Sequence, residues 1–539
     1  MSDRFCHAAA VTIDTPDWVR DAVFYQIFPD RFAVSDRVPK PGPLEPWESP
    51  PTVHGFKGGD LLGVAERLPY LADLGVTAIY LTPVFASASN HRYHTYDYFA
   101  VDPLLGGDAA LRELLDAAHA RGMRVILDGV FNHTGRGFWA FHHVLETGAA
   151  SPYRHWFLVD QSALDAGMPI LAYPGAAARN DVGSGVGTDE PSVGQDAPTG
   201  DGGWSMRRLG YRAWWDLAAL PKLNTGNPVV REYLLSVAEH WIRFGIDGWR
   251  LDVPAEIHDE TFWQEFRRRC RSANPEAYLV GEVWHVGREW VAGDRFDALM
   301  NYPLAEAILS FAGGAHLDEE VIRGHHEYGP TIRRIDGATF ALRLEELQDA
   351  YDPAVVAVQL NLLDSHDSPR VHSLVGGDRA AYRLAVLLQA TLPGAPCVYY
   401  GDEIGLEGRN DPDCRRSFPR DEAAWDRELV AFVAAAFRLR HAYGALRRGS
   451  LRIAGTAGDA LAFERRLADE RVLVALNAGE ESATVEANLP DAPDGDLVEL
   501  GLPWPEATAA PAAPAAPRLS SGTVPIPIGA RAARLFRLR

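Results

Sequence analysis

Eight short apolar runs recur along the chain, and each has the length of a buried β-strand. They cover residues 22–28, 76–81, 124–130, 246–252, 277–282, 296–300, 358–363 and 396–400. Between most of them apolar residues return every three or four positions, which predicts amphipathic helices over segments such as 61–74, 111–118 and 230–241. Strands that alternate with helices in this way predict an α/β protein with a (β/α)8 TIM barrel. An open, doubly wound sheet is the alternative, but no glycine-rich phosphate loop follows the first strand.

Two parts of the chain depart from this alternation. Residues 135–224 show no regular repeat, and the stretch 168–203 is rich in Gly, Asp, Ala and Pro. Because so long an irregular stretch inside a compact unit is usually functional, we expect a small inserted domain after the third strand. Beyond residue 443, short alternating segments predict a C-terminal antiparallel β-sandwich, with an Ala/Pro-rich loop at 507–517. The expected domains are the barrel in two parts (1–134 and 225–442), the inserted domain (135–224) and the C-terminal β-sandwich (443–539).

The composition narrows the classes of partner. The 539 residues carry a formal net charge of −21, which argues against nucleic acid and anionic membranes and favours a neutral or small substrate. The four cysteines lack metal-ligand spacing, so we expect reduced thiols in a cytoplasmic protein. The N-terminus has no apolar core of signal-peptide length, and no stretch approaches the ~20 apolar residues that a membrane helix needs. The oligomeric state is left open.

A pair of opposite charges marks the end of the fourth expected strand. Arg250 and Asp252 are two residues apart, so their side chains point to the same face of that strand. By itself such a pair is an ordinary ion pair at a strand end. The interpretation changes because the fifth strand ends on Glu282 and the seventh leads to His366 and Asp367. In (β/α)8 enzymes the chemistry takes place where the carboxyl ends of the strands meet.

Three carboxylates at the same rim of the barrel, where the carboxyl ends of its strands meet, suggest a retaining glycosidase. In such enzymes two carboxyl groups are held ~5 Å apart. Arg250 is expected to lower the pKa of Asp252, which suits an anionic nucleophile. Glu282 follows an apolar strand and precedes Val283 and Trp284, so its pKa is expected to be raised, as an acid catalyst requires. Asp367 is then a third acid that favours a positively charged transition state.

Other side chains on the same rim are suited to holding a sugar. His133 and His366 can donate hydrogen bonds to hydroxyl groups of the same ring. Tyr93 and Trp284 can stack on a sugar face, although a role in the barrel core is equally open for each ring. These residues come from different strand ends, so only convergence in the fold would bring them together.

Metal ions are weighed on the same residues. A catalytic metal is disfavoured, because Arg250 within the cluster would oppose a cation and no H-x-H or HExxH motif is present. The chemistry therefore requires no cofactor. A structural Ca²⁺ stays open, with Asn132 and oxygens of the inserted domain as candidate ligands.

Four motifs resemble glycoside hydrolase family 13, the α-amylase family, in order and spacing. They are DGVFNH at 128–133, GWRLD at 248–252, GEVW at 281–284 and LDSHD at 363–367. Supporting matches are YQIFPDRF at 25–32, LPKLN at 220–224 and PCVYYGDE at 396–403, so the resemblance spans roughly residues 18–440. It implies a retaining double displacement at an α-glucosidic bond, with an α-glucan oligosaccharide as the partner.

The resemblance also implies a role for each matching residue. By position, Asp252 is the nucleophile, Glu282 the acid/base and Asp367 the stabiliser of the transition state. The positions that it places around the sugar at subsite −1, where the bond is cut, are Arg250, His133, His366 and Tyr93, with Asp128 supporting the site.

The branch of the family is indicated by two motifs. LPKLN at 220–224 and NDPDCR at 410–415 resemble the cyclomaltodextrinase, neopullulanase and maltogenic amylase group. That group usually carries an N-terminal β-domain, which we expect to be absent because the barrel begins near residue 18. The implied activity is hydrolysis of α-1,4 bonds, with α-1,6 bonds left open, in maltooligosaccharides, cyclodextrins or starch fragments. The alternatives are a trehalose- or sucrose-active glucosyltransferase or isomerase with the same three acids and, more remotely, a non-catalytic carbohydrate-binding barrel.

Overall fold

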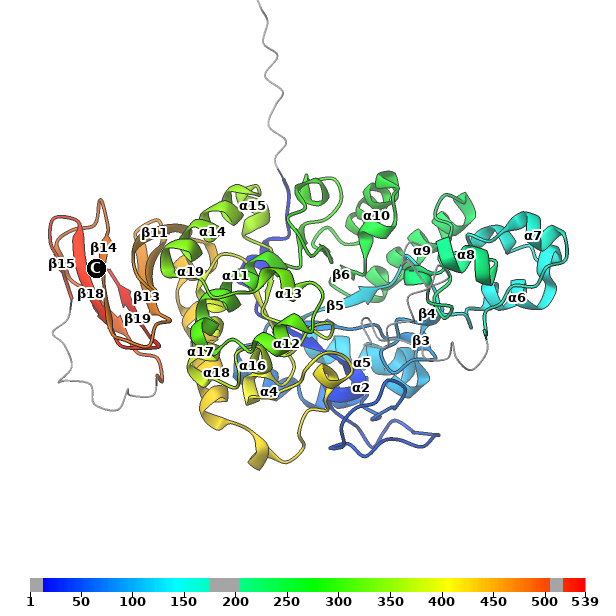
Figure 1. The fold of residues 1–539 in the computed structure, drawn as a ribbon, viewed down its shortest axis with the longest axis horizontal. Coiled ribbons are helices and arrows are strands. Elements are labelled where there is room, and N and C mark those ends of the chain that lie inside the picture. Colours follow the sequence, from blue (N-terminus) through cyan, green and yellow to red (C-terminus); the bar gives the residue numbers. More distant parts are fainter. Residues whose placement is uncertain (1–12, 175–202, 505–516, 539) are drawn as a thin grey trace, which may run out of the picture.

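A ring of eight parallel strands lies at the centre of the molecule. The computed structural model describes residues 13–174, 203–504 and 517–538 (Figure 1). The strands are β1 (Phe24–Ile27), β2 (Ala78–Leu81), β5 (Arg124–Gly129), β6 (Gly248–Leu251), β7 (Tyr278–Gly281), β8 (Ala298–Leu299), β9 (Leu360–Leu362) and β10 (Ala395–Tyr399). They pair in the order β8-β7-β6-β5-β2-β1-β10-β9, and a parallel bridge from Met300 to Leu360 joins the two ends of the sheet. The predicted (β/α)8 barrel is confirmed.

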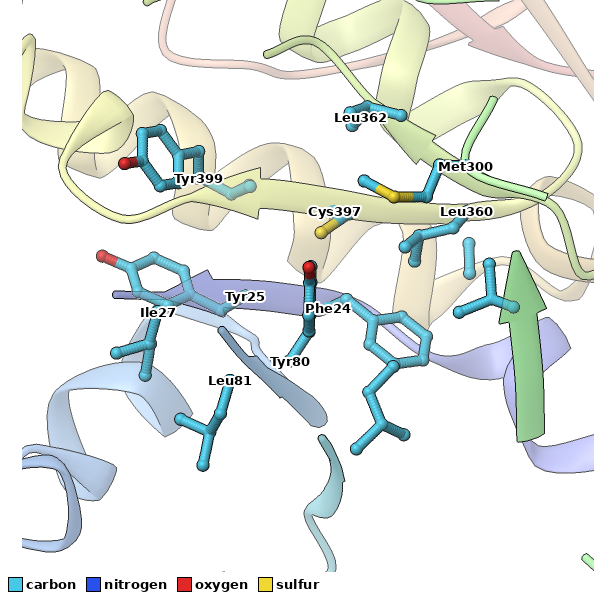
Figure 2. Packing of buried hydrophobic residues seen from close by; sticks show 14 of the residues in the cluster. Phe24, Tyr25, Ile27, Tyr80, Leu81, Met300, Leu360, Leu362, Cys397 and Tyr399 are labelled. Atoms are coloured by element: carbon cyan, nitrogen blue, oxygen red, sulfur yellow. The ribbon is translucent and has the colours of Figure 1, made fainter. Parts of the chain in front are cut away.

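The strands are buried on both faces, which is why they form continuous apolar runs in the sequence. Figure 2 shows Phe24 and Tyr25 of β1 packed with residues of β2, β9 and β10. Every residue of β1, β2 and β10 is buried. This packing leaves few places for polar side chains within the barrel, so those that are present deserve a functional explanation.

Helices surround the barrel, as Figure 1 shows. The longer ones are α5 (Gly107–His119), α9 (Pro228–Phe244), α10 (Glu260–Ala273), α11 (Tyr302–Gly313), α14 (Gly337–Asp349), α17 (Arg379–Thr391) and α18 (Arg427–Ala442). The single helix expected over 61–74 is instead two, α3 (Leu61–Glu66) and α4 (Leu68–Leu74). Pro69 has no N–H to donate, and its ring opposes a continuous helix. The helix is therefore interrupted at Arg67, although the spacing of apolar residues continues across it. None of the helices in the described part of the chain has the length and apolar character that crossing a membrane requires.

The segment between β5 and α9 leaves the barrel. Its described part contains the short helices α6 (Trp139–Thr147), α7 (Gln161–Asp165) and α8 (Gly203–Leu209). Residues 175–202 lie outside the described residues, and so does most of the Ala/Pro-rich stretch near the C-terminus. Isolated bridges from His133 to Lys222 and from Phe157 to Leu223 connect the two ends of the segment. In Figure 1 this segment (cyan) and the C-terminal strands (orange and red) lie on opposite sides of the barrel.

The C-terminal region is an antiparallel β-sandwich, as predicted. One sheet has the order β11-β12-β13-β19-β16, and β14 pairs with β18 in the second layer. The bounds are β11 (Ser450–Ala457), β12 (Ala460–Leu467), β13 (Glu470–Asn477), β14 (Ala483–Asn488), β16 (Val498–Leu500), β18 (Thr523–Ile528) and β19 (Ala532–Arg537). Leu473, Val485, Ile526 and Phe536 belong to a separate apolar core between the layers.

One buried arginine ties this sandwich to the barrel. Arg465 of β12 is fully buried and donates through Nη1 to the carbonyl of Thr391, the last residue of α17. Its Nη2 donates to the Gly449 carbonyl at 2.8 Å. Both acceptors would lose a charged donor if the guanidinium were removed, which costs about 2–3 kcal/mol per contact of this kind.

We therefore expect Arg465→Met to lower the midpoint of thermal unfolding by several degrees while leaving the activity of the folded protein unchanged. Arg466→Met is the matched control, because the neighbouring Arg466 is exposed. Circular dichroism during heating measures both variants. Equal midpoints for the two would contradict a docking role for Arg465.

Candidate active site

The polar side chains singled out in the sequence converge at the carboxyl ends of the barrel strands. Asp128 lies in β5 and Arg250 in β6. Asp252 follows β6 directly, and Glu282 follows β7 directly. Asp367 lies in the loop after β9. Tyr93 comes from a feature that the sequence did not reveal, the turn between β3 (Phe85–Ser87) and β4 (Thr95–Val101).

Arg250 is the centre of this cluster and is fully buried. Its Nη1 donates to both oxygens of Asp128 at 2.9 Å and to Oδ1 of Asp252 at 3.2 Å. Its Nη2 lies 3.0 Å from Oε1 of Glu282. One guanidinium therefore contacts three carboxyl groups, and the first and last of these are 154 residues apart in the sequence. The alternation of side chains along β6 places Asp252 on the same face as Arg250.

The pKa values of the carboxyl groups correct one expectation from the sequence. Burial raises the pKa of Asp252 well above its usual value, and the carboxylates of Glu282, Asp128 and Asp367 raise it further, against the opposing charge of Arg250. Arg250 does lower the pKa of Asp252, as predicted, but the net shift is upward and not downward. One cation does not compensate for burial and three like charges.

Glu282 behaves as predicted, because burial raises its pKa. Its Oε1 accepts a hydrogen bond from Nε1 of Trp284 at 3.3 Å, and its Oε2 accepts one from the Val253 backbone at 3.0 Å. Val253 has a φ of 34°, a strained conformation for a β-branched residue. This strain directs the Val253 N–H towards Glu282, so the backbone after Asp252 also positions the second carboxyl group.

Asp367 differs from the other two acids. Partial burial opposes its charge, but His366 and Arg415 lower its pKa below the usual value. His366 Nε2 lies 3.1 Å from Oδ2, and Arg415 Nη2 lies 3.2 Å from Oδ1. Asp367 is therefore the carboxyl group in the cluster that stays ionised most readily, as a stabiliser of positive charge requires.

The two predicted histidines are buried and neutral. Burial lowers the pKa of His133 to about 3 and that of His366 to about 3. The Tyr93 ring lies parallel to His366 with centroids 5.4 Å apart, and the Tyr93 hydroxyl donates to Asp128 at 2.8 Å. The ring of His133 lies parallel to Trp214, with centroids 5.0 Å apart.

A pocket opens at this end of the barrel, with an empty volume of about 860 Å³ including its mouth. Of the predicted residues, those that line it are Tyr93, His133, Asp252, Glu282, Trp284 and Asp367. Arg250, His366 and Asp128 lie behind this wall and act through their contacts with it. One face of Trp284 is covered by Tyr302, with ring centroids 3.6 Å apart, so a sugar can use only the other face or the edge.

Sequence reasoning missed part of the pocket wall. Asp411 and Arg415 line it, and they are paired at 3.1 Å. Burial raises the pKa of Asp411 to about 6. A signal was present, because the polar run at 410–415 follows the last barrel strand, where functional loops are expected. Trp214 and Trp215 also line the pocket, but they come from the segment without periodicity and gave no signal.

The described residues were also compared with the requirements of a metal site. No three His, Cys, Asp or Glu side chains within them gather in a way that would hold a metal ion. Asn132, the candidate Ca²⁺ ligand, is buried beside His133, and its Oδ1 has no hydrogen-bond partner within the described ranges. Ca²⁺ takes six to eight oxygen ligands, so a site at Asn132 would need further oxygens from the inserted domain, and it stays a prediction.

Known proteins share both the sequence and the fold. Residues 26–441 match the alpha amylase catalytic domain. The cyclomaltodextrinase of Geobacillus thermopakistaniensis is 39% identical over 488 residues, which are 89% of this chain and 73% of that protein. The debranching enzyme of Nostoc punctiforme, in its acarbose-soaked crystal structure, is 40% identical with a TM-score of 0.79, covering 97% of this chain and 99% of that one. The cyclic alpha-maltosyl-(1→6)-maltose hydrolase of Arthrobacter globiformis, in complex with that sugar, is 34% identical with a TM-score of 0.78, covering 97% and 100%.

Proposed function

Because the chain belongs to the alpha-amylase family of glycoside hydrolases, we propose that it cleaves α-glucosidic bonds in short glucans with retention of configuration. The observation that carries the proposal is the fully buried Arg250, which contacts Asp128, Asp252 and Glu282 beneath a pocket that Asp367 also lines. Two carboxyl groups held by one cation, with a third acid nearby, suit a displacement through a covalent intermediate.

In the first step Asp252 attacks the anomeric carbon and Glu282 gives a proton to the departing glycosidic oxygen. Asp252 is placed for the attack, because it lines the pocket while Arg250 holds its Oδ1. In the second step Glu282 removes a proton from water, which attacks the same carbon and releases Asp252. Asp367 stabilises the positive charge that develops on the sugar ring in both steps.

Asp252 and Glu282 titrate together, because both carboxyl groups contact Arg250. In the free site both oxygens of Glu282 accept hydrogen bonds, and burial raises the pKa of both Asp252 and Glu282. Positive charge developing at the anomeric carbon favours the Asp252 anion, so in the reacting complex the proton of the pair is held on Glu282, as the reaction requires.

The substrate that we propose is a maltooligosaccharide, a cyclodextrin or a starch fragment. The names of the relatives include a cyclomaltodextrinase, a debranching enzyme and a hydrolase bound to a cyclic α-1,6-linked sugar. We therefore propose that α-1,4 bonds are cut and that α-1,6 bonds are accepted as well. An exposed Trp215 beside Trp214 at the pocket wall offers aromatic surface for further glucose units.

Product analysis over time tests the proposal. The substrates are maltotriose, β-cyclodextrin, soluble starch, pullulan, maltose and sucrose, and proton NMR identifies the anomer that is released first. We expect short and cyclic glucans to be consumed fastest and the α-anomer to appear before mutarotation. Release of the β-anomer would refute retention. Rearrangement of maltose or sucrose without net hydrolysis would identify a glucosyltransferase or isomerase, and no turnover of any substrate would favour a binding protein.

Glu282→Gln separates the acid role from a purely structural one. An amide has no acidic proton, so we expect the rate on maltotriose to fall about 10²–10⁴-fold. An aryl glucoside with a good leaving group needs no proton in the first step, so formation of the glycosyl-enzyme should be affected far less. Rapid-quench kinetics on both substrates measures the difference. An equal loss on both would show that Glu282 is not chiefly a general acid.

A further inference from the structure

A hydrogen bond connects the first strand of the barrel to His366, which lies in the loop after β9. Gln26 of β1 is buried, and its side-chain nitrogen lies 2.8 Å from Nδ1 of His366. β10 lies between β1 and the strand β9 that leads to His366. The contact thus crosses the end of the barrel, between residues 340 positions apart. Gln26 does not line the pocket, so it has no part in the chemistry described above.

The charges around His366 determine which ring nitrogen carries the proton. Burial lowers the pKa of His366 to about 3, so the ring is neutral and has a single proton. Its Nε2 lies 3.1 Å from Oδ2 of Asp367, whose pKa is lowered and which is therefore an ionised acceptor. A lone pair on Nε2 would face that negative charge, so the proton belongs on Nε2.

The remaining neighbours are consistent with this tautomer. The Tyr93 hydroxyl also lies beside Nε2, and it donates its own proton to Asp128, so its oxygen can accept from Nε2–H. The charged groups Arg250 and Arg415 disfavour a second proton on the ring. Nδ1 must then accept a hydrogen bond, and the donor beside it is the amide of Gln26.

We propose that Gln26 is a positioning residue that fixes His366 in the Nε2–H tautomer and so holds Asp367 ionised and correctly oriented. The effect reaches the reaction only through His366, Asp367 and Tyr93. The identity of that reaction rests on the proposed function, but the tautomer itself does not. A carboxamide is suited to the task, because it can donate to Nδ1 without bringing a further charge into a site that already holds four carboxyl groups.

Gln26→Glu and Gln26→Leu test the proposal by different routes. A carboxylate at position 26 accepts a hydrogen bond from Nδ1–H. At neutral pH this leaves Nε2 without a proton and with its lone pair facing the Asp367 carboxylate. We expect kcat/KM for an aryl α-glucoside to fall about 10–100-fold, as for other losses of an orienting hydrogen bond. The deficit should shrink as the pH is lowered, because the introduced carboxyl group, once protonated, donates to Nδ1 as the Gln26 amide does and so restores Nε2–H. Leu at position 26 leaves Nδ1 without a donor, so its smaller loss should not recover at low pH.

Gln359→Glu is the matched control. Gln359 is also a buried amide, but its Oε1 accepts from the Leu299 backbone, a contact that a carboxylate retains, and it lies at the other end of β9. This variant should show the wild-type shape of the pH–rate profile. Parallel profiles for Gln26→Glu and the wild type would overturn the proposal.

Nitrogen NMR of histidine-labelled protein provides a readout that needs no substrate. Subtraction of the His366→Asn spectrum identifies the His366 signals, and each nitrogen's shift reports whether it is protonated. We expect Nε2–H with a bare Nδ1 in the wild type, and a protonated Nδ1 in Gln26→Glu. A protonated Nδ1 in the wild type would overturn the proposal even if the enzyme is an active glucan hydrolase. The expected tautomer in a protein without glucan hydrolysis would instead refute the proposed function alone.

Discussion

Replacing Asp252 with Asn is expected to lower kcat/KM on maltooligosaccharides by about 10⁴-fold or more. The amide cannot form the glycosyl ester, and no other carboxyl group takes its place, because Glu282 and Asp128 are held by their own contacts with Arg250. The rate is measured with maltotriose on protein purified separately from any wild-type enzyme. Asp294→Asn, at an exposed carboxylate, is the matched control and should keep full activity.

The same substitution should not destabilise the fold. Because the pKa of Asp252 is raised in the folded protein, the stability that its protonated form contributes is present at low pH and is lost as the pH rises through that raised pKa. Asn carries no charge, so the thermal midpoint of Asp252→Asn should equal or exceed that of the wild type at pH 8. Substantial activity, or inactivity explained by unfolding, would contradict the assignment of Asp252 as the nucleophile.

Replacing Arg250 with Met is expected to damage both activity and stability. The guanidinium is the shared cation of Asp128, Asp252 and Glu282, so its loss leaves buried carboxyl groups without compensation. Breaking a buried ion pair from one side costs about 3–5 kcal/mol. Arg250→Lys keeps the charge but lacks the planar fork, so it should recover part of the stability and little of the activity.

The loss of the positive charge of Arg250 determines the direction in which the pH–rate profile moves. Arg250 lowers the pKa of Asp252 and Glu282, so its removal raises both further. The acid limb of the pH–rate profile of Arg250→Met should move to higher pH, measured with an aryl glucoside on residual activity. Protonation relieves the unpaired charges, so the stability loss relative to the wild type should be smaller at pH 5 than at pH 8. An unmoved acid limb would argue that Arg250 only supports the fold.

Much of this architecture is readable in the sequence. The eight barrel strands are short apolar runs because they are buried on both faces, and the C-terminal sandwich alternates because each of its strands has one buried face. The candidate site was predicted because a parallel barrel brings the carboxyl ends of its strands together, so that residues at strand ends are neighbours in space. The shared direction of Arg250 and Asp252 needed only the two-residue period of a strand.

Other features gave no local signal. Trp214 and Trp215 reach the pocket from a segment without periodicity. The turn that carries Tyr93 lies in a β-hairpin, and no alternation of apolar and polar residues in the sequence predicted it. The break between α3 and α4 was visible as Pro69, but the apolar spacing continued across it.

What the sequence by itself determined is the set of strand ends and therefore the list of acids on the rim. What only the tertiary structure decided is the charge that each acid carries. The pKa of Asp252 depends on its burial and on Glu282, Asp128 and Asp367, which reach it from other strands. The tautomer of His366 likewise depends on Gln26, 340 positions away. Electrostatic interactions act through space and grow as water is excluded, so they are defined only once the strands have closed around the site.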